Sequence, residues 1–203
     1  IYKNTTIDPP GTIKHCIDNG VEVLEPKISF LKLIEKKGFP TRRARFCCDY
    51  LKEYKIMDIA IQGIRRSESV KRAKNYTEPT MCRIYGSKSK HVNVILPILD
   101  FTDRDVEEFV IERGIKLHQL YYNEDGTTNI KKRLGCMGCP LKCDNGLSDF
   151  KANPKLVKAW LRAGYKWWKN KPNTNSHKKF TDIYEMFVSD IFFNSYNRSM
   201  AII

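Results

Sequence analysis

The 203-residue sequence lacks long apolar runs, a signal-peptide pattern and internal repeats. No segment approaches the roughly 18 consecutive apolar residues that a membrane span requires. The first residues do not follow the basic-then-apolar order of a secretory signal. These absences predict a cytoplasmic protein with no membrane partner. A charged fraction of 29% and an aromatic fraction of 11% are typical of a globular chain and not of a disordered one.

Acidic residues are scarce relative to basic ones. The chain has 36 Lys and Arg against 23 Asp and Glu, a formal net charge of +13. Residues 151–203 alone contain ten basic and three acidic residues. Such an excess favours polyanionic partners, meaning nucleotides, nucleic acids or an acidic protein, and it equally fits a well-solvated surface.

Short apolar runs alternate with amphipathic stretches over the first 120 residues. Strands are predicted at 1–5, 21–24, 57–62 and 92–96, and helices at 11–19, 29–37, 45–54, 68–74 and 102–114. This alternation predicts the α/β class, with a parallel sheet and helices on both faces. A polar, cysteine-rich segment (121–150) follows. The segment 151–203 is predicted as a basic helical extension, with helices at 155–168 and 180–193 around a polar linker at 170–179.

Seven cysteines are present, and five of them lie in two groups. Cys47 and Cys48 are adjacent, while Cys136, Cys139 and Cys143 follow one another closely. In a chain without a secretory signal, such grouping indicates metal binding or thiol chemistry and not a disulfide framework. The isolated Cys16 and Cys82 are expected to be small core residues.

The two cysteine groups are predicted to bind one metal centre. Cys136 and Cys139 form a C-x-x-C turn in which Gly135 and Gly138 let the backbone wrap around a bound group. Cys47 and Cys48 are the obvious remaining ligands, although Cys143 could replace one of them. Adjacent cysteines fit an iron–sulfur cluster more easily than a single zinc ion, so a cluster is favoured and structural zinc is the alternative.

Several stretches together resemble one protein family. They are IYKNTTIDPPGTIKH (1–15), GFPTRRARFCCDYLK (38–52), GIRRSES (63–69), PILDFTDRDVEEFVIERGIKLHQLY (97–121) and RLGCMGCPL (133–141). They are similar to the phosphoadenosine phosphosulfate reductase family of the adenine nucleotide α-hydrolase-like superfamily. The cysteine spacing resembles the [4Fe-4S] signature of assimilatory adenylyl-sulfate reductases. The resemblance implies a Rossmann-like nucleotide-binding domain over 1–120 and a [4Fe-4S] cluster on Cys47, Cys48, Cys136 and Cys139.

The segment GIRRSES also has the chemistry of an anion site. Gly63 can open a tight turn after a strand, Arg65 and Arg66 present forked donors, and Glu68 and Ser69 lie at a helix start, where backbone amides favour an anion. A solvated basic turn is the alternative.

By resemblance, Arg65 would contact the anionic part of ATP or adenylyl sulfate, with Mg²⁺ as a candidate ion. Thr5, at the end of the first strand, and Arg45, just before the cysteine pair, complete the predicted nucleotide-binding set. Arg45 could face the cleft at the carboxyl edge of the sheet.

Two departures from the family pattern shape the functional prediction. The family's Ser-Gly-Gly-x-Asp-Ser phosphate loop is absent, and the sequence starts at Ile1 inside a strand, so we expect the natural chain to begin upstream. The reductases attack their substrate with a cysteine near the C-terminus, whereas the last cysteine here is Cys143.

We therefore expect a nucleotide-binding sulfur-transfer enzyme, related to those that adenylate a substrate with ATP, with a sulfur donor and with DNA or RNA as a candidate acceptor. One alternative is a sulfonucleotide reductase that uses thioredoxin. Another is a non-catalytic nucleotide- or nucleic-acid-binding protein with structural zinc. The catalytic residues are not identified.

The segment 158–171 interleaves basic and aromatic side chains. Trp160 and Trp167 have two interpretations, as rings that stack on bases or as the apolar face of an amphipathic helix. The second is favoured.

Overall fold

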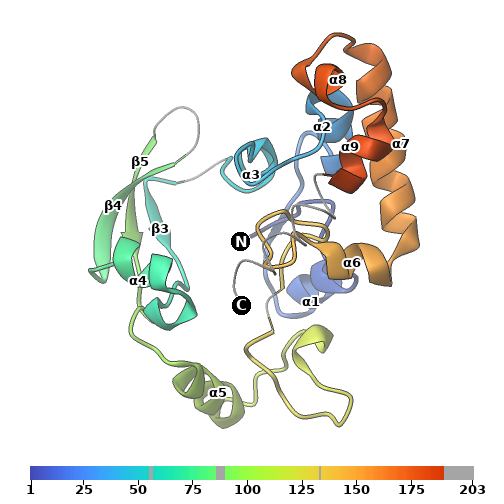
Figure 1. Ribbon diagram of the computed structural model, residues 1–203. Helices are drawn as coiled ribbons and strands as arrows, with labels where there is room; N and C mark the ends of the chain where they lie inside the picture. Colours follow the sequence, from blue (N-terminus) through green and yellow to red (C-terminus); the bar gives the residue numbers. More distant parts are fainter. Residues whose placement is uncertain (55–56, 86–89, 133, 190–203) are drawn as a thin grey trace. The chain divides into compact units, whose positions relative to one another are not determined.

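The computed structural model describes residues 1–54, 57–85, 90–132 and 134–189. The chain forms two compact units, each with its own hydrophobic core. Unit 1 combines Ile1–Lys52 with the chain from Gly135 onward, and unit 2 is Glu53–Leu134. Figure 1 shows the elements of both units along the chain.

Unit 1 is mainly helical. Its two strands, β1 (Tyr2–Lys3) and β2 (Val23–Leu24), pair in parallel, and α1 (Thr12–Asp18) connects them. The remaining elements of this unit are α2 (Phe30–Lys37), α3 (Phe46–Leu51), α6 (Leu147–Ala152), α7 (Pro154–Asn170), α8 (Asn175–Lys179) and α9 (Ile183–Val188).

The core of unit 1 forms around Trp160 of α7, which is 1% exposed. Its ring centroid lies 5.0 Å from those of Phe30 and Phe150 and 6.0 Å from that of Phe39. Trp167 on the same helix is also buried. The interpretation of these two tryptophans as core residues is therefore confirmed, and base stacking by them is wrong.

Local sequence signals explain where the helices begin. Ser29 caps α2 by accepting a hydrogen bond from the amide of Lys32, and Asn153 caps α7 in the same way, with Pro154 in its first turn. Thr102 and Asp105 form a reciprocal capping box at the start of α5 (Asp103–Glu112).

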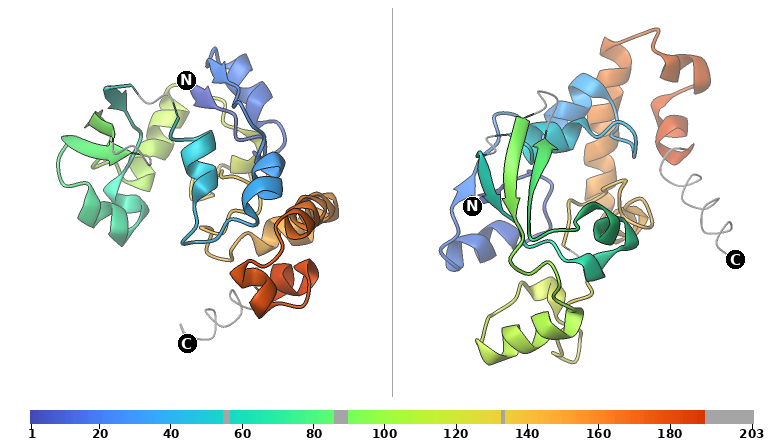
Figure 2. Two further views of the ribbon diagram at one scale, coloured as in Figure 1. Left: turned by 90° about the horizontal axis from the view of Figure 1, so that it is seen from above. Right: turned by 90° about the vertical axis from the view of Figure 1, so that its left-hand side faces the viewer.

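Unit 2 is a small α/β unit. Its sheet has the order β3-β5-β4, in which β3 (Ile59–Ile61) runs parallel to β5 (Lys90–Ile95), and β4 (Thr80–Tyr85) runs antiparallel to β5. The two opposed arrows of β4 and β5 are visible in Figure 2. The unit also contains α4 (Val70–Asn75), α5 and the single 3₁₀ turns η1 (Arg66–Glu68) and η2 (Gln119–Tyr121). Its core consists of Val92, Val94, Leu96 and Leu99.

The α/β class with parallel strand pairs is confirmed. The sheet of unit 2 is nevertheless mixed, because β4 runs antiparallel to β5. This strand was not predicted. An antiparallel strand on an otherwise parallel sheet is common in α/β folds.

Two predictions for the C-terminal segment need correction. The predicted polar linker contains α8, and the predicted helix at 180–193 corresponds to α9, with residues 190–193 outside the described part of the chain. The predicted division of the chain into a nucleotide-binding domain (1–120), a cysteine-rich segment (121–150) and a basic helical extension (151–203) stays a prediction. Within the described residues, no helix has both the length and the apolar character to span a bilayer.

Candidate functional site: an anion pocket and a cysteine group

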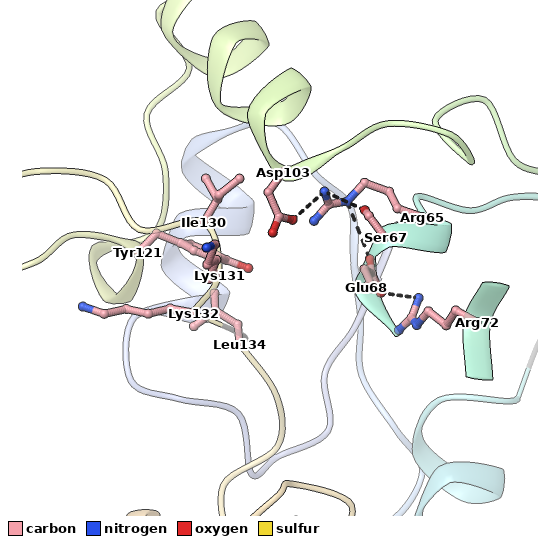
Figure 3. A pocket seen from close by; sticks show the side chains of 10 residues that line it. All are labelled: Arg65, Ser67, Glu68, Arg72, Asp103, Tyr121, Ile130, Lys131, Lys132 and Leu134. Carbon is pink, nitrogen blue, oxygen red and sulfur yellow. Dashed lines mark hydrogen bonds and ion pairs between the residues drawn. The ribbon is translucent and has the colours of Figure 1, made fainter. Parts of the chain in front are cut away.

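Unit 2 contains a polar pocket of about 320 Å³. Four cationic side chains and two carboxylates contribute to its wall, together with a serine, a tyrosine and two aliphatic residues. Figure 3 shows these residues, which are Arg65, Ser67, Glu68, Arg72, Asp103, Tyr121, Ile130, Lys131, Lys132 and Leu134. We call this cavity the anion pocket, because its lining carries an excess of positive charge.

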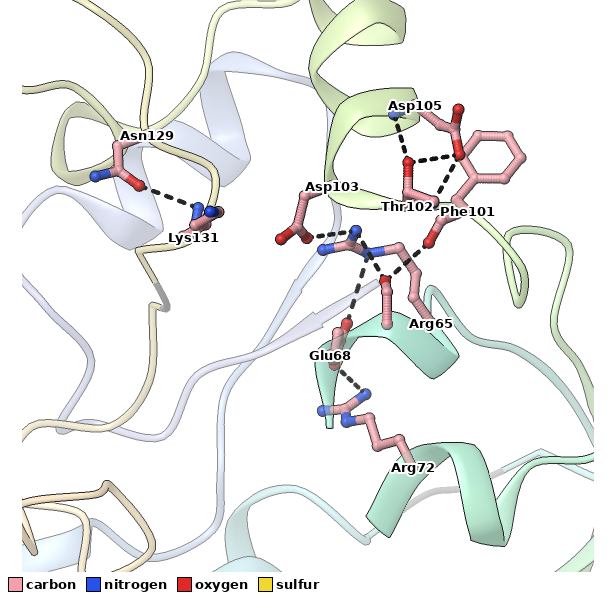
Figure 4. Close-up of polar contacts among 10 residues, drawn as sticks. Arg65, Glu68, Arg72, Phe101, Thr102, Asp103, Asp105, Asn129 and Lys131 are labelled. Carbon is pink, nitrogen blue, oxygen red and sulfur yellow. Dashed lines mark hydrogen bonds and ion pairs between the residues drawn. The ribbon is translucent and has the colours of Figure 1, made fainter. Parts of the chain in front are cut away.

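Arg65 is held firmly in the wall of the anion pocket. Its side chain is only 11% exposed, and its Nη1 lies 2.8 Å from Oδ1 of Asp103. Nη1 also donates to the hydroxyl of Ser67 at 3.4 Å, and Nε lies 3.9 Å from a carboxylate oxygen of Glu68. Figure 4 shows that Asp103 is presented at the start of α5, beside the capping box of Thr102. The guanidinium is thus fixed in direction before any ligand binds.

Glu68 links two guanidinium groups. Its carboxylate lies 2.7 Å from Nη1 of Arg72, and the side chain is 16% exposed. Lys132 donates to the carbonyl of Tyr122 at 2.8 Å. Lys131 has no carboxylate partner among the residues that the structure describes. Its ammonium group is the lining charge best suited to meet an incoming anion.

The residues predicted in GIRRSES separate into two groups. Arg65 and Glu68 line the anion pocket. Arg66 instead donates to the carbonyls of Tyr76 and Thr77 and pairs with Asp100.

The two remaining residues of this motif have local roles. The Ser69 hydroxyl caps α4 by accepting from the amide of Arg72 at 3.2 Å. A Cβ on Gly63 would lie 3.6 Å from Cδ1 of Ile98, an ordinary contact, so space does not require glycine there. Nucleotide binding by the predicted residues of GIRRSES stays a prediction.

Sequence reasoning did not select Arg72, Asp103, Tyr121, Lys131 or Lys132 as site residues. Two local signals were available. Arg72 stands four residues after Glu68, the spacing at which helical side chains of opposite charge pair. Lys131 and Lys132 begin a basic run just before the C-x-x-C turn.

In unit 1, the four predicted metal ligands influence one another electrostatically. Cys47 and Cys48 belong to α3, while Cys136 and Cys139 lie in the turn before α6. The hydrogen bond from Cys47 lowers the pKa of Cys48 to about 6, assisted by the nearby Arg45, against the opposing effect of burial. The hydrogen bond to Cys48 and burial raise the pKa of Cys47, and the charges of Cys136 and Cys139 add to this effect.

Two cations accompany this cysteine group. Arg45, from the predicted nucleotide-binding set, donates from Nη2 to Sγ of Cys48 at 3.7 Å. Burial acts to lower the pKa of Lys52, but the charge of Cys136 and a hydrogen bond with it, together with Cys48 and Cys139, raise it overall. Positive charge is therefore available to stabilise thiolates, the form in which cysteine binds metals.

Thr5 lies beside the cysteine group and not in the anion pocket. Its hydroxyl donates to Asp8 at 2.7 Å and accepts from the thiol of Cys136 at 3.5 Å. The same turn is held to the segment after β1 by a backbone hydrogen bond from Met137 to Ile7. Thr5 thus positions Cys136.

Gly138 fits the cysteine turn against the core. Its φ is +70°, and an added Cβ would lie 2.5 Å from Cζ of Phe150 and 3.0 Å from Trp160. The Gly138 amide donates to Asp149 of α6 at 2.7 Å. Gly135 meets only the end of the Lys142 side chain, at 3.9 Å, so the requirement for glycine applies to Gly138.

The cysteine group is not a closed site for a single ion. Among the described residues, no three His, Cys, Asp or Glu side chains are placed to hold one metal ion. Four thiolates on one zinc ion approach to about 3.8 Å of each other, given zinc–sulfur bonds of about 2.3 Å. In an iron–sulfur cluster each thiolate binds a different iron. Cluster binding by these four cysteines stays a prediction.

The isolated cysteines differ from each other. Cys16 is partly buried, and burial raises the pKa of its thiol. Cys82 is exposed on β4, so its predicted core position is wrong. Its Sγ lies 3.6 Å from Nδ1 of His91 on β5.

Comparison with known proteins supplies the family. The model of the phosphoadenosine phosphosulfate reductase domain matches residues 5–142. The chain belongs to this family. The match includes Thr5, all four predicted metal ligands and all the described lining of the anion pocket. Members of this phosphoadenosine phosphosulfate reductase family are generally enzymes, and nucleotide binding fits the family. The iron–sulfur signature stays a prediction.

Two relatives extend the comparison. An uncharacterized protein of Methanocaldococcus jannaschii is 32% identical over 174 residues, which cover 79% of this chain and 39% of that protein. An uncharacterized 37.8 kDa protein of Escherichia phage 186 is 33% identical over 138 residues, which cover 61% of this chain and 38% of that protein. The chain thus spans well under half the length of either relative.

Proposed function

We propose that the chain is part of an adenine-nucleotide-binding enzyme that transfers sulfur, and that the anion pocket receives the charged end of the nucleotide. The observation that carries this proposal is the pre-oriented guanidinium of Arg65 in a wall that also contains Arg72, Lys131 and Lys132. ATP and adenylyl sulfate both present a compatible anionic end.

The size of the anion pocket suits this role. A volume of about 320 Å³ is at the lower end of the range for ligand sites, roughly 300–1,000 Å³. It fits a phosphate or sulfate group with its neighbouring atoms better than a whole nucleotide. Fixed cationic donors stabilise negative charge that develops during a reaction at phosphorus or sulfur, and they need no rearrangement to do so.

We further propose that Cys47, Cys48, Cys136 and Cys139 hold a [4Fe-4S] cluster. When bound, the cluster would supply electron transfer or a binding point for sulfur. Arg45 and Lys52 favour thiolate ligands, and Thr5 orients Cys136 through its hydroxyl. The proposed sulfur acceptor is a nucleic acid. A thioredoxin-dependent sulfonucleotide reductase is the alternative reaction.

Calorimetric titration of the full chain with ATP and with adenylyl sulfate tests the nucleotide proposal. Lys131→Gln should weaken binding about tenfold or more, because it removes one charge-assisted hydrogen bond of about 1.5–3 kcal/mol. Lys131→Arg should retain most of the affinity. Lys74→Gln, an exposed change on α4 outside the pocket, is the matched control. Equal losses in the Lys131 and Lys74 variants would contradict the proposal.

Metal analysis tests the cluster proposal. Protein purified without oxygen should contain about four irons and four acid-labile sulfides per chain. Cys136→Ser and Cys139→Ser should lose them, whereas Cys82→Ser should keep them. Zinc alone would reject the cluster. Consumption of adenylyl sulfate that requires reduced thioredoxin would favour the reductase.

A further inference from the structure

The outer face of α7 carries a continuous row of positive charge. Its cations follow one another at intervals of three and four residues and lie on the side opposite the buried Trp160 and Trp167, and the helix contains no Asp or Glu. Figures 1 and 2 show α7 as a long helix followed by α8 and α9. We call this row the α7 stripe, and its members are Lys155, Lys158, Arg162, Lys166 and Lys169.

The α7 stripe works against the stability of its own helix. Lys155 lies in the first turn of α7, where the helix dipole disfavours cations. The pairs Lys158–Arg162 and Arg162–Lys166 are four residues apart, and like charges at this spacing repel by about 0.2–0.5 kcal/mol per pair. Of the five cations, only Lys166 has a carboxylate partner in the part of the chain that the structure describes, Glu35 at 2.9 Å. The charges are therefore more consistent with binding a partner than with folding.

The neighbouring segment extends the positive charge. Lys171, Lys178 and Lys179 are exposed in and before α8. The His177 ring of α8 stacks on Trp168 of α7 with a centroid distance of 3.7 Å, and its Nε2 lies 3.0 Å from the Trp168 carbonyl oxygen. These contacts hold α8 against the end of α7, so its lysines keep a defined position relative to the stripe.

We infer that the α7 stripe binds the phosphate backbone of a nucleic acid. At 1.5 Å per residue the stripe is about 21 Å long, or roughly six nucleotide steps at 3.4 Å each. Tyr165 is 43% exposed on the same face, with the Lys169 ammonium 4.8 Å from its ring centroid. An exposed aromatic ring among cations is the arrangement on which an unpaired base stacks.

A membrane surface fits this face less well. An amphipathic helix at a bilayer inserts its apolar side into the lipid, whereas the apolar side of α7 is the core of unit 1. The inference adds a partner-binding surface to the proposed function. It rests on the proposed function only in naming a nucleic acid as partner. Its failure would count against the nucleic-acid acceptor and would leave the proposals for the anion pocket and the cysteine group standing.

Fluorescence anisotropy with labelled single-stranded RNA, single-stranded DNA and duplex DNA tests the α7 stripe. Five phosphate contacts predict a slope of about −4.5 for log K against log salt concentration with a duplex, or roughly a 500-fold loss of affinity between about 50 and 200 mM salt. The triple variant Lys155→Gln, Lys158→Gln, Arg162→Gln should reduce the magnitude of this slope by about 2.7. The matched control is Lys14→Gln, Lys27→Gln, Lys36→Gln, which removes the same charge from exposed sites of unit 1 outside α7.

Two measurements on the same proteins decide the outcome. The stripe variant should bind nucleic acid at least tenfold more weakly than the control variant, and it should melt at the same or a higher temperature because repulsion is relieved. Equal binding by the two variants, or preferential binding of anionic vesicles or polyglutamate to the wild-type chain, would overturn the inference.

Discussion

Replacing Gly138 by alanine tests how the cysteine turn is joined to the core of unit 1. The φ of +70° costs a residue with a Cβ about 1–2 kcal/mol. The new Cβ would also lie 2.5 Å from the Phe150 ring and 3.0 Å from the Trp160 ring. Both rings are buried and tightly packed, and overpacking of this kind typically costs about 1–3 kcal/mol. We expect Gly138→Ala to lower the free energy of unfolding by about 2–5 kcal/mol.

A second glycine separates the two contributions to this loss. Gly20 has a φ of +68°, and an added Cβ there meets nothing within 4 Å. Gly20→Ala should therefore cost only the backbone contribution, about 1–2 kcal/mol. The difference between the two variants measures the steric contribution at Gly138.

The assay is urea unfolding followed by tryptophan fluorescence on metal-free protein. All three tryptophans, Trp160, Trp167 and Trp168, belong to α7, so the signal reports on unit 1. In a Phe150→Leu background, the cost of Gly138→Ala should decrease, because the clashing ring is gone. Losses for Gly138→Ala and Gly20→Ala that agree within about 0.5 kcal/mol would refute the steric argument.

Two further predictions concern charged groups outside the proposed ligand contacts. Arg66→Gln should destabilise unit 2 by about 1–3 kcal/mol in thermal melts, because it removes hydrogen bonds to the Tyr76 and Thr77 carbonyls and to Asp100. A loss of nucleotide affinity at unchanged stability would instead place Arg66 in binding. Hydrogen bonds from Lys32 and Lys166 hold the pKa of Glu35 below its usual value. Glu35 therefore stabilises the fold above its unfolded pKa, and this contribution is lost as the pH falls through the folded pKa. We expect the free energy of unfolding, measured by urea titration between about pH 3 and 7, to fall less on the acid side for Glu35→Gln than for the wild type, by up to about 1 kcal/mol. An equal fall in the two proteins would contradict this assignment.

Features that depend on neighbouring residues were predictable from the sequence. The capping of α5 by Thr102 follows from the residues of a single turn. The buried side of α7 follows from helical periodicity, which places Trp160 and Trp167 on one face. The same periodicity determines that Lys155, Lys158 and Arg162 lie on the opposite face.

The missed strand has a physical explanation. In β4, exposed and half-buried residues alternate, and Arg83 and Thr80 dilute the apolar pattern. An edge strand of this kind is stabilised by its hydrogen bonds to β5, and no short-range pattern encodes that pairing. The same limit applies to Cys82, whose exposure follows from the face of β4 on which it lies.

For the candidate sites too, some features follow from the sequence alone and others depend on the tertiary structure. Cysteine chemistry was predictable, because Cys47, Cys48, Cys136 and Cys139 stand in pairs along the chain. The sequence alone also determines the family and the excess of positive charge. Tertiary structure decides which arginines serve which purpose. Arg65 meets Asp103, 38 residues away, and enters the wall of the anion pocket, whereas the adjacent Arg66 turns to backbone carbonyls and a different carboxylate. The two residues have the same chemistry and adjacent positions. Only the path of the folded backbone places Arg65 in the pocket wall and Arg66 against backbone carbonyls.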